Sequence, residues 1–265
     1  GTGLGEAGLY WDGHAHRPFA TEGGHATFGP HDALDVEFWR WLRLRHGHVS
    51  WERVVSGPGL VELYRFLRER GGGEPPWLAE EMCRDDPAAV VSRAALAHRD
   101  PLCEEALDRW VRLYGAEAGN LALKTMATGG VYVGGGIAPR ILPKLRDGAF
   151  MAGFLDKGRM RPLLETMPVR VVLNERVALL GAARCAIARR PGGLRTGALQ
   201  PVAGHAGGAP ERSSEARRES GQRRVDGPRL PRQVPLALHG VEVPHVEHVQ
   251  VDDGDVGHGA SFPSP

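Results

Sequence analysis

Two acidic side chains and a histidine are the residues of this sequence with the clearest chemical use. Glu22 and His25 flank two glycines in Glu22-Gly23-Gly24-His25, and Glu52 follows in a separate segment. A carboxylate accepts hydrogen bonds and an imidazole both donates and accepts, so the set suits a ligand with several hydroxyl groups. The glycines would let the backbone approach such a ligand. Each residue alone could equally be a solvated surface side chain, but the combination favours a binding site.

Two glycine clusters mark possible contacts with phosphate or nucleotide. Residues Gly1–Gly5 read GTGLG, whose backbone N–H groups could face phosphate oxygens, although such clusters also form ordinary tight turns. A phosphate loop normally follows a strand, but GTGLG stands at residue 1, so this sequence holds no strand ahead of it. The second cluster spans 129–137, where glycines bracket a short β-branched and aromatic strand ahead of Ala138-Pro139-Arg140. A strand, a glycine turn and a helix form the α/β arrangement that approaches a nucleotide.

Helices and strands alternate around these segments. One helix is predicted after Pro58, where apolar side chains recur at helical spacing until the glycines at 71–73 (Leu60, Leu63, Tyr64 and Leu67). Another begins at Asp100-Pro101, a capping side chain followed by a proline at the first helical position, and runs to about Ala127. A strand over 169–173 and a helix over 178–187 follow. The pattern predicts an α/β fold.

Composition excludes several classes of partner. The chain has 265 residues and a formal net charge of +1, with basic and acidic residues interspersed, so it has no strong field for nucleic acid or an acidic membrane. No apolar run reaches the roughly 20 residues of a membrane helix, and no leader is visible in the sequence as it stands. Three scattered cysteines without a Cys-x-x-Cys pair indicate free thiols in the cytoplasm rather than disulfides or a zinc site.

The sequence changes character near residue 190. All six tryptophans precede it, whereas 190–265 is rich in Gly, Pro, Arg and Ser and contains one aromatic residue, Phe262. Such a segment buries too little apolar surface to offset chain entropy, so we expect a low-complexity tail that is disordered or translated from a misread frame. A short alternating run over 241–251, interrupted by Pro244, predicts at most an edge strand there. Histidines and aspartates of the tail match no metal-site spacing, and we assign no metal ligand.

Several motifs together resemble the bacterial glucokinase family, the ATP-dependent hexose kinases of the actin-like ATPase superfamily. The resemblance rests on the Glu-Gly-Gly-His segment, on Glu52 within 48–54, on Ser56-Gly57-Pro58-Gly59-Leu60, and on the two glycine clusters. The segments 154–159 and 179–183 also look like the family's later parts. The resemblance implies the ribonuclease H-like, hexokinase-type α/β fold. Residues 1–189 would form mainly the larger lobe, with part of the C-terminal helix of the small lobe, and 190–265 has no counterpart.

The resemblance also implies an activity and a set of site residues. The family phosphorylates D-glucose at the 6-hydroxyl with ATP and Mg²⁺, giving glucose 6-phosphate at the entry to glycolysis, and its members are often homodimers. In this chain the sugar would be clamped by Glu22, His25 and Glu52. The second phosphate loop would be formed by Gly1, Thr2 and Gly3, and the adenosine side by Gly129, Gly130, Gly134, Gly135 and Gly136.

Two parts of the family's catalytic machinery are not found in this sequence. Similar glucokinases carry an Asp-x-Gly-Gly-Thr phosphate loop and an Asn-Asp pair whose aspartate is the base, both upstream of the GTGLG loop. No aspartate of residues 1–190 matches them, so the base is expected upstream of residue 1 and the catalytic residue is unknown. We therefore expect a truncated gene product without appreciable kinase activity. The alternatives are a sugar-binding relic or a sugar-responsive regulator, although the latter class typically carries a cysteine-rich zinc motif.

Overall fold

The computed structural model describes residues 3–71, 73–188 and 246–248. These residues fall into two compact parts, one reaching Glu175 and including the strand near the C-terminus, the other holding the helix α10 (Val177–Ala188). Each part is described by itself. The predicted glycine-loop residues Gly1 and Thr2 lie outside the described residues, as does the predicted tail except for 246–248.

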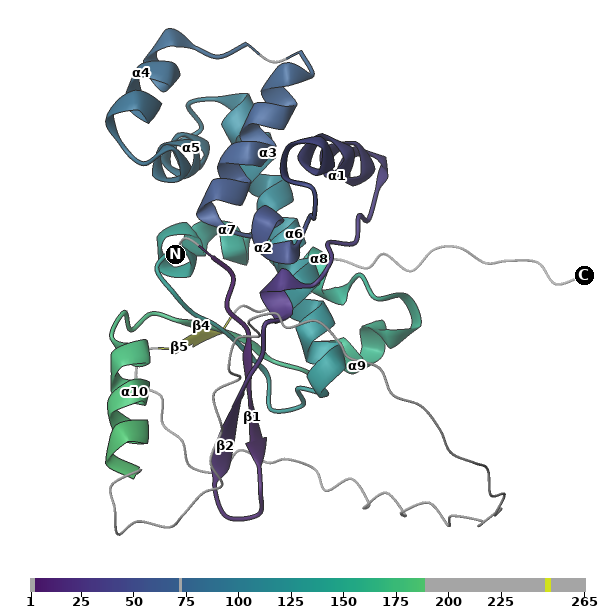
Figure 1. Ribbon diagram of the computed structural model, residues 1–265, viewed down its shortest axis with the longest axis vertical. Coiled ribbons are helices and arrows are strands. Elements are labelled where there is room, and N and C mark those ends of the chain that lie inside the picture. Colours follow the sequence, from purple (N-terminus) through teal and green to yellow (C-terminus); the bar gives the residue numbers. More distant parts are fainter. Residues whose placement is uncertain (1–2, 72, 189–245, 249–265) are drawn as a thin grey trace, which may run out of the picture. The chain divides into compact units, whose positions relative to one another are not determined.

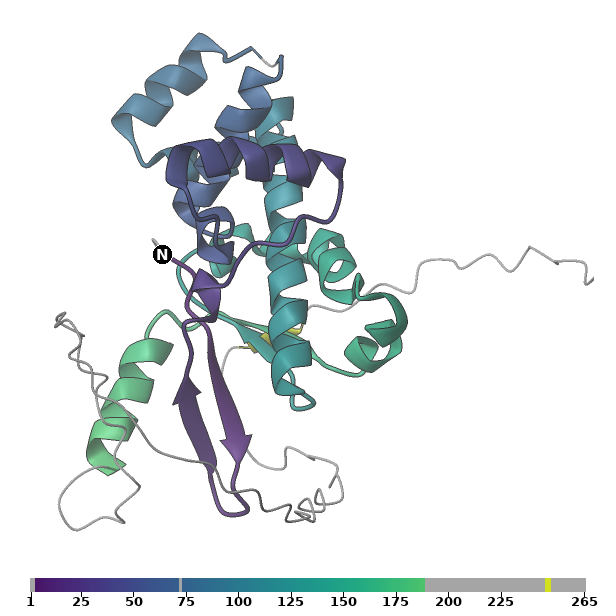
Figure 2. The ribbon, with the colours of Figure 1, turned by 45° about the vertical axis from the view of Figure 1, so that its right-hand side comes forward.

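Helices make up most of the first part, and Figures 1 and 2 show the long helix α6 running through them. Helices α3, α5 and α8 pack directly on α6, and α1 packs on α3. The helices are α1 (Ala33–His46), α2 (Trp51–Val54), α3 (Gly57–Glu69), α4 (Pro76–Arg84), α5 (Pro87–Leu96), α6 (Pro101–Thr125), α7 (Leu142–Arg146), α8 (Ala149–Leu155) and α9 (Arg161–Glu165), with short 3-10 turns η1 (Gly23–His25), η2 (Ala138–Ile141) and η3 (Gly158–Met160).

The two helices predicted from spacing and capping are confirmed. The Asp100 carboxylate accepts a hydrogen bond from the Cys103 N–H at 2.8 Å, which caps α6 ahead of its first-turn proline. The Ser56 hydroxyl caps α3 in the same way, accepting from the Gly59 N–H at 3.1 Å. The Trp110 indole then donates to the Ser56 carbonyl at 3.1 Å, so the start of α3 is fixed to the middle of α6.

Glycines allow α6 and α8 to cross closely. A side chain at Gly115 would collide with the Phe150 backbone, and one at Gly153 would collide with the Arg112 backbone. Because backbone rather than a movable side chain occupies the space, these positions require glycine. The core formed around this crossing contains several fully buried aromatic side chains (Phe38, Tyr64, Trp110, Phe150 and Phe154).

Two small sheets complete the first part. Strands β1 (Ala7–Trp11) and β2 (His16–Ala20) form an antiparallel hairpin, with Ala7 opposite Ala20. Strands β3 (Val131–Val133) and β4 (Val169–Val172) were both predicted as strands, and the structure pairs them in parallel. Strand β5 (Val246–His248) pairs antiparallel with β4. The α/β class is confirmed, and only three residues of the predicted 241–251 edge strand are described as a strand.

The hairpin was not predicted from the sequence, and neither were the helices α1, α4, α5 and α8. Its turn is held by the Asp12 carboxylate, which accepts from the His14 and Ala15 N–H groups at 2.8 Å each. Gly13 has a φ of 97°, a conformation that favours glycine. The Asp-Gly pair between apolar residues was therefore the available signal for this hairpin.

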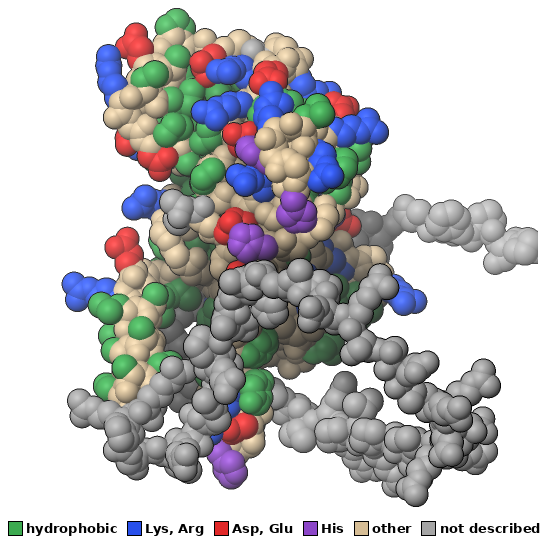
Figure 3. Space-filling view, in the orientation of Figure 1, with side chains coloured by type: hydrophobic (Ala, Val, Ile, Leu, Met, Phe, Trp, Pro, Cys, Tyr) green, Lys and Arg blue, Asp and Glu red, His purple; other side chains and the backbone are tan. Residues whose placement is uncertain are grey.

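Charges of both signs are distributed over the helical region on the face drawn in Figure 3. Among the described residues, no helix is both long enough and apolar enough to cross a membrane.

Candidate active site

The 3-10 turn η1 carries two of the three predicted sugar contacts. The His25 N–H donates to the Glu22 carbonyl at 3.0 Å, which closes the turn. The Nε2 atom of His25 lies 3.8 Å from a Glu22 carboxylate oxygen. The Glu22 side chain is 91% exposed, so it is free to turn toward a ligand beside His25.

Helix α2 brings the third residue to the same place. The Ser50 hydroxyl caps α2 by accepting from the Arg53 N–H at 3.2 Å, and Thr27 and Ser50 form an isolated antiparallel bridge that holds α2 beside η1. The Oε1 atom of Glu52 consequently lies 4.0 Å from Nδ1 of His25. The structure thus brings Glu22, His25 and Glu52, which the sequence predicted as one site, around a single imidazole. Their role in binding stays a prediction.

The segment that follows the predicted phosphate loop touches the same cluster. The Leu4 N–H donates to Oε2 of Glu52 at 3.0 Å. A side chain at Gly3 would meet the Glu52 carboxylate, whose Cδ lies 3.2 Å from the site of the absent Cβ. Gly3 is therefore the one residue of the Gly1, Thr2 and Gly3 set that the structure describes, and it lies beside a sugar-site carboxylate.

The two clamp glycines have a structural role that the sequence did not indicate. A Cβ atom at Gly23 would overlap the Glu6 carboxylate, and one at Gly24 would overlap the Leu4 carbonyl. We expected these glycines to let the backbone approach a ligand. In the structure the space that they leave is filled by the segment 4–6, which locks that segment against η1.

The second glycine cluster is divided between the two ends of β3. Gly129 and Gly130 precede the strand, where Gly130 has a φ of 108° and a Cβ there would lie 2.5 Å from the Pro168 carbonyl. Gly134, Gly135 and Gly136 follow the strand, and the space beside Gly135 is open. Because ligands of parallel α/β sheets bind at the carboxyl ends of the strands, the second group has the better position for a nucleotide.

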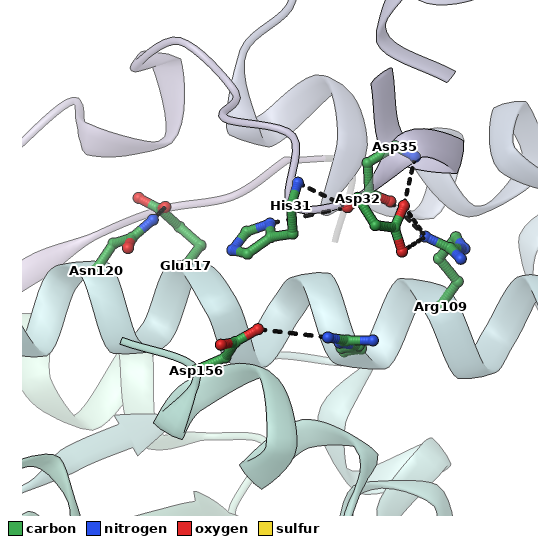
Figure 4. Close-up of polar contacts among 8 residues, drawn as sticks. His31, Asp32, Asp35, Arg109, Glu117, Asn120 and Asp156 are labelled. Carbon is green, nitrogen blue, oxygen red and sulfur yellow. Dashed lines mark hydrogen bonds and ion pairs between the residues drawn. The ribbon is translucent and has the colours of Figure 1, made fainter. Parts of the chain in front are cut away.

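A charged cluster between α1 and α6 was not identified from the sequence (Figure 4). The Asp35 side chain is only 2% exposed, and Arg109 donates to it at 2.6 Å and to Asp32 at 2.9 Å. Asp35 also accepts from the His31 N–H at 3.1 Å. Burial lowers the pKa of His31, which keeps the imidazole neutral near pH 7. Each of these charged side chains has a partner, so the cluster serves to hold α1 on α6.

The described ranges 3–71, 73–188 and 246–248 contain no cluster of metal-binding side chains. Within them, no three side chains of the types His, Cys, Asp or Glu come close enough together to hold an ion.

Comparison with known proteins shows the family of the chain. Residues 1–189 match the family model described as Glucokinase. The curated glucokinase of Nostoc punctiforme is 45% identical over 200 residues, which cover 70% of this chain and 59% of that protein. The glucokinase of a Synechocystis species is 46% identical over 201 residues, covering 70% of this chain and 57% of that protein.

Solved structures give the same family. A crystal structure of glucokinase from an Antarctic psychrotroph is similar at a TM-score of 0.60 and 33% identity, over 69% of this chain and 55% of that one. A glucokinase of Balamuthia mandrillaris, crystallised in complex with glucose, shares the fold at a TM-score of 0.53 and 20% identity, over 63% of this chain and 46% of that one. The chain spans about half the length of the curated relatives that it matches. With the family model covering residues 1–189, the chain belongs to the glucokinase family.

Proposed function

We propose that this chain carries the glucose site of an enzyme that transfers the γ-phosphoryl group of ATP to the 6-hydroxyl of D-glucose. The observation that carries the proposal is the convergence of Glu22 and Glu52 on the two ring nitrogens of His25, at 3.8 and 4.0 Å. At these distances neither carboxylate is hydrogen-bonded to the imidazole, so all three groups keep capacity for sugar hydroxyls.

Glu52 is the best-positioned residue of the three. Its Oε2 atom is fixed by the Leu4 N–H, while Oε1 faces His25 and can accept from a sugar hydroxyl. The side chain is 33% exposed, so it is accessible to a ligand yet already oriented. An acceptor oriented in this way loses less entropy when the sugar binds. Glu22, which is far more exposed, would close over the sugar from the other side of the imidazole.

The nucleotide side of the proposal rests on the turn after β3. Gly134, Gly135 and Gly136 have no side chains to block an approaching adenosine, and the φ of 103° at Gly135 favours glycine in that turn. ATP supplies the phosphoryl group, and Mg²⁺ would accompany its phosphates as in other phosphoryl transfers. We assign no Mg²⁺ ligand to the described residues. The contacts of Gly3 and Leu4 with Glu52 support a phosphate loop next to the sugar cluster.

Calorimetric titration with D-glucose tests the sugar site in the chain as it stands, with mannitol as an open-chain control. We expect saturable binding of glucose and none of mannitol. The absence of any glucose binding by the folded chain would overturn the proposed function.

A chimera tests the transfer step. Residues 1–189 would be joined to the part of the Nostoc punctiforme relative that this chain does not match, and glucose 6-phosphate would be measured by a coupled dehydrogenase assay. We expect ATP-dependent product from the chimera and none from the 265-residue chain alone, which has neither the first phosphate loop nor the Asn-Asp pair of the family. A chimera that folds and binds glucose yet makes no product would contradict the assignment.

The proposal also includes the cellular location and the oligomeric state of the enzyme. The cysteines at 83, 103 and 185 are all free, which supports a cytoplasmic location. The family resemblance supports a homodimer, for which light scattering should give twice the mass of the chain.

A further inference from the structure

Two carboxyl groups meet beneath the sugar cluster. The Oε1 atoms of Glu6 and Glu117 are both buried and have no hydrogen-bond partner among the described residues. Glu117, in the middle of α6, is only 2% exposed. The Glu6 carboxyl group lies within hydrogen-bonding reach of the Glu117 carboxyl group. Burying a polar oxygen without a hydrogen-bond partner destabilises the folded state. The two oxygens therefore require a proton or a cation between them.

The neighbouring side chains give the Glu117 carboxyl group a hydrogen-bond donor at only one of its two oxygens. Asn120 donates to its Oε2 atom at 2.7 Å, and both side chains extend from the same side of α6 (Figure 4). The Lys124 ammonium group lies 3.6 Å from Oε1, too far for a hydrogen bond, and is more than half exposed to solvent. Lys157 is a further charged group that interacts with Glu117, and burial lowers the pKa of its ammonium group.

Burial also acts on Glu117 itself. It raises the pKa of this carboxyl group to about 7, against the opposing effects of Asn120 and Lys124, and the nearby Glu6 raises it further. A carboxylic acid that keeps its proton near neutral pH can donate a hydrogen bond to a second carboxylate. One proton would therefore satisfy both orphaned oxygens.

We propose that Glu6 and Glu117 share one proton, and that this protonated pair positions the sugar-binding turn η1. The part of the proposal that concerns glucose rests on the proposed function. A bound cation is the other way to give these two oxygens a partner. We favour the proton because the Lys124 ammonium group and one proton together balance the two negative charges of the pair.

The contacts of Glu6 show how the pair would act on the site. The carboxylate of Glu6 occupies the space that a side chain at Gly23 would fill. The Glu6 carbonyl accepts from the Thr21 hydroxyl at 3.1 Å, and the same hydroxyl accepts from the Gly23 N–H at 3.1 Å. Loss of the proton would leave two buried negative charges side by side, which repel and drive Glu6 away from η1. The turn that holds Glu22 and His25 would then lose its support.

Glucose titrations across pH test this role in the whole chain. In the wild type we expect the dissociation constant to rise by up to about tenfold for each pH unit above 7, as the proton is lost. Glu117→Gln keeps a hydrogen-bond donor that does not titrate, so its affinity should match the wild type at low pH and show a weaker pH dependence. Glu117→Leu has no donor and should bind weakly at every pH. Equal pH dependence in the wild type and Glu117→Gln would overturn the positioning role.

Infrared difference spectra keep this test separate from that of the proposed function. A protonated carboxyl group gives a carbonyl band that carboxylates lack. We expect this band in the folded wild type at neutral pH, with or without glucose, and its loss in both Glu117→Gln and Glu6→Gln. If the band is absent, or if added K⁺ or Mg²⁺ stabilises the wild type but not Glu117→Gln at alkaline pH, the shared proton is wrong and a bound cation replaces it.

Discussion

The substitution Glu117→Gln should flatten the pH dependence of the free energy of unfolding. The carboxyl group of Glu117 has an ordinary pKa of 4.5, which burial raises to about 7 in the folded chain. The folded state therefore holds this proton more tightly than the unfolded state does. The resulting stabilisation is fully present below pH 4.5 and is lost as the pH rises to about 7. Glutamine does not titrate and removes this contribution.

The magnitude follows from the interval between the two pKa values. At about 1.36 kcal/mol for each pKa unit, an interval from 4.5 to about 7 corresponds to roughly 3 kcal/mol. This stabilisation belongs to the pair formed with Glu6, because the two carboxyl groups interact. It is a substantial fraction of the roughly 5–15 kcal/mol by which domains are usually stable.

Urea unfolding followed by tryptophan fluorescence, at several values between about pH 4.5 and pH 8, measures this effect. His31 contributes in the opposite sense because burial lowers its pKa, so the wild type is compared with the variant at each pH. Glu80→Gln is the matched control, since Glu80 is an exposed partner of Arg84 on α4. The control should keep the wild-type slope. A Glu117→Gln variant with the wild-type slope would refute the reasoning.

Two other predictions concern buried groups away from the sugar site. Arg109→Ala leaves the buried Asp35 carboxylate without its guanidinium and should lower the free energy of unfolding by about 3 kcal/mol. The control Arg112→Ala breaks an exposed ion pair and should lower it by less than about 1 kcal/mol. Equal losses of the two variants in urea unfolding would contradict this assignment. The Cys103 thiol is buried and its pKa is raised by burial, so a native thiol titration at pH 8 should count two reactive groups rather than three.

Local signals in the sequence were sufficient for several elements of the fold. The limits of α6 follow from a capping aspartate, a first-turn proline and apolar spacing, all of which act within one helix. Strands β3 and β4 each follow from a short β-branched run with glycine or proline beside it, whereas their parallel pairing was not predicted. The structure brings the predicted sugar contacts Glu22, His25 and Glu52 together, while their role in binding stays a prediction. That prediction depended on the family resemblance, because no periodic pattern links residues 25 and 52.

Pairs of residues distant in the chain are the site features that the sequence did not predict. Asp35 and Arg109 are 74 positions apart, and nothing in the spacing of either helix indicates that they meet. Glu6 and Glu117 look like ordinary surface acids in the sequence, one in a glycine-rich segment and one on a long helix. Their Oε1 atoms are buried because the 4–6 segment lies against η1 and the Glu6 carboxyl group reaches Glu117 on α6, which is a tertiary effect. A glutamate among small residues in Gly115-Ala116-Glu117-Ala118-Gly119 was the available sign of a buried position.

The central claim is that Glu52 accepts a hydroxyl of bound glucose, and a paired calorimetric titration tests it most directly. Glu52→Gln keeps the size of the side chain but turns one acceptor oxygen into a donor, which mismatches the sugar. We expect glucose affinity to fall by at least about tenfold, a loss of about 1.4 kcal/mol, while the exposed control Glu80→Gln binds like the wild type. Unchanged affinity in folded Glu52→Gln would contradict the account and remove Glu52 from the site.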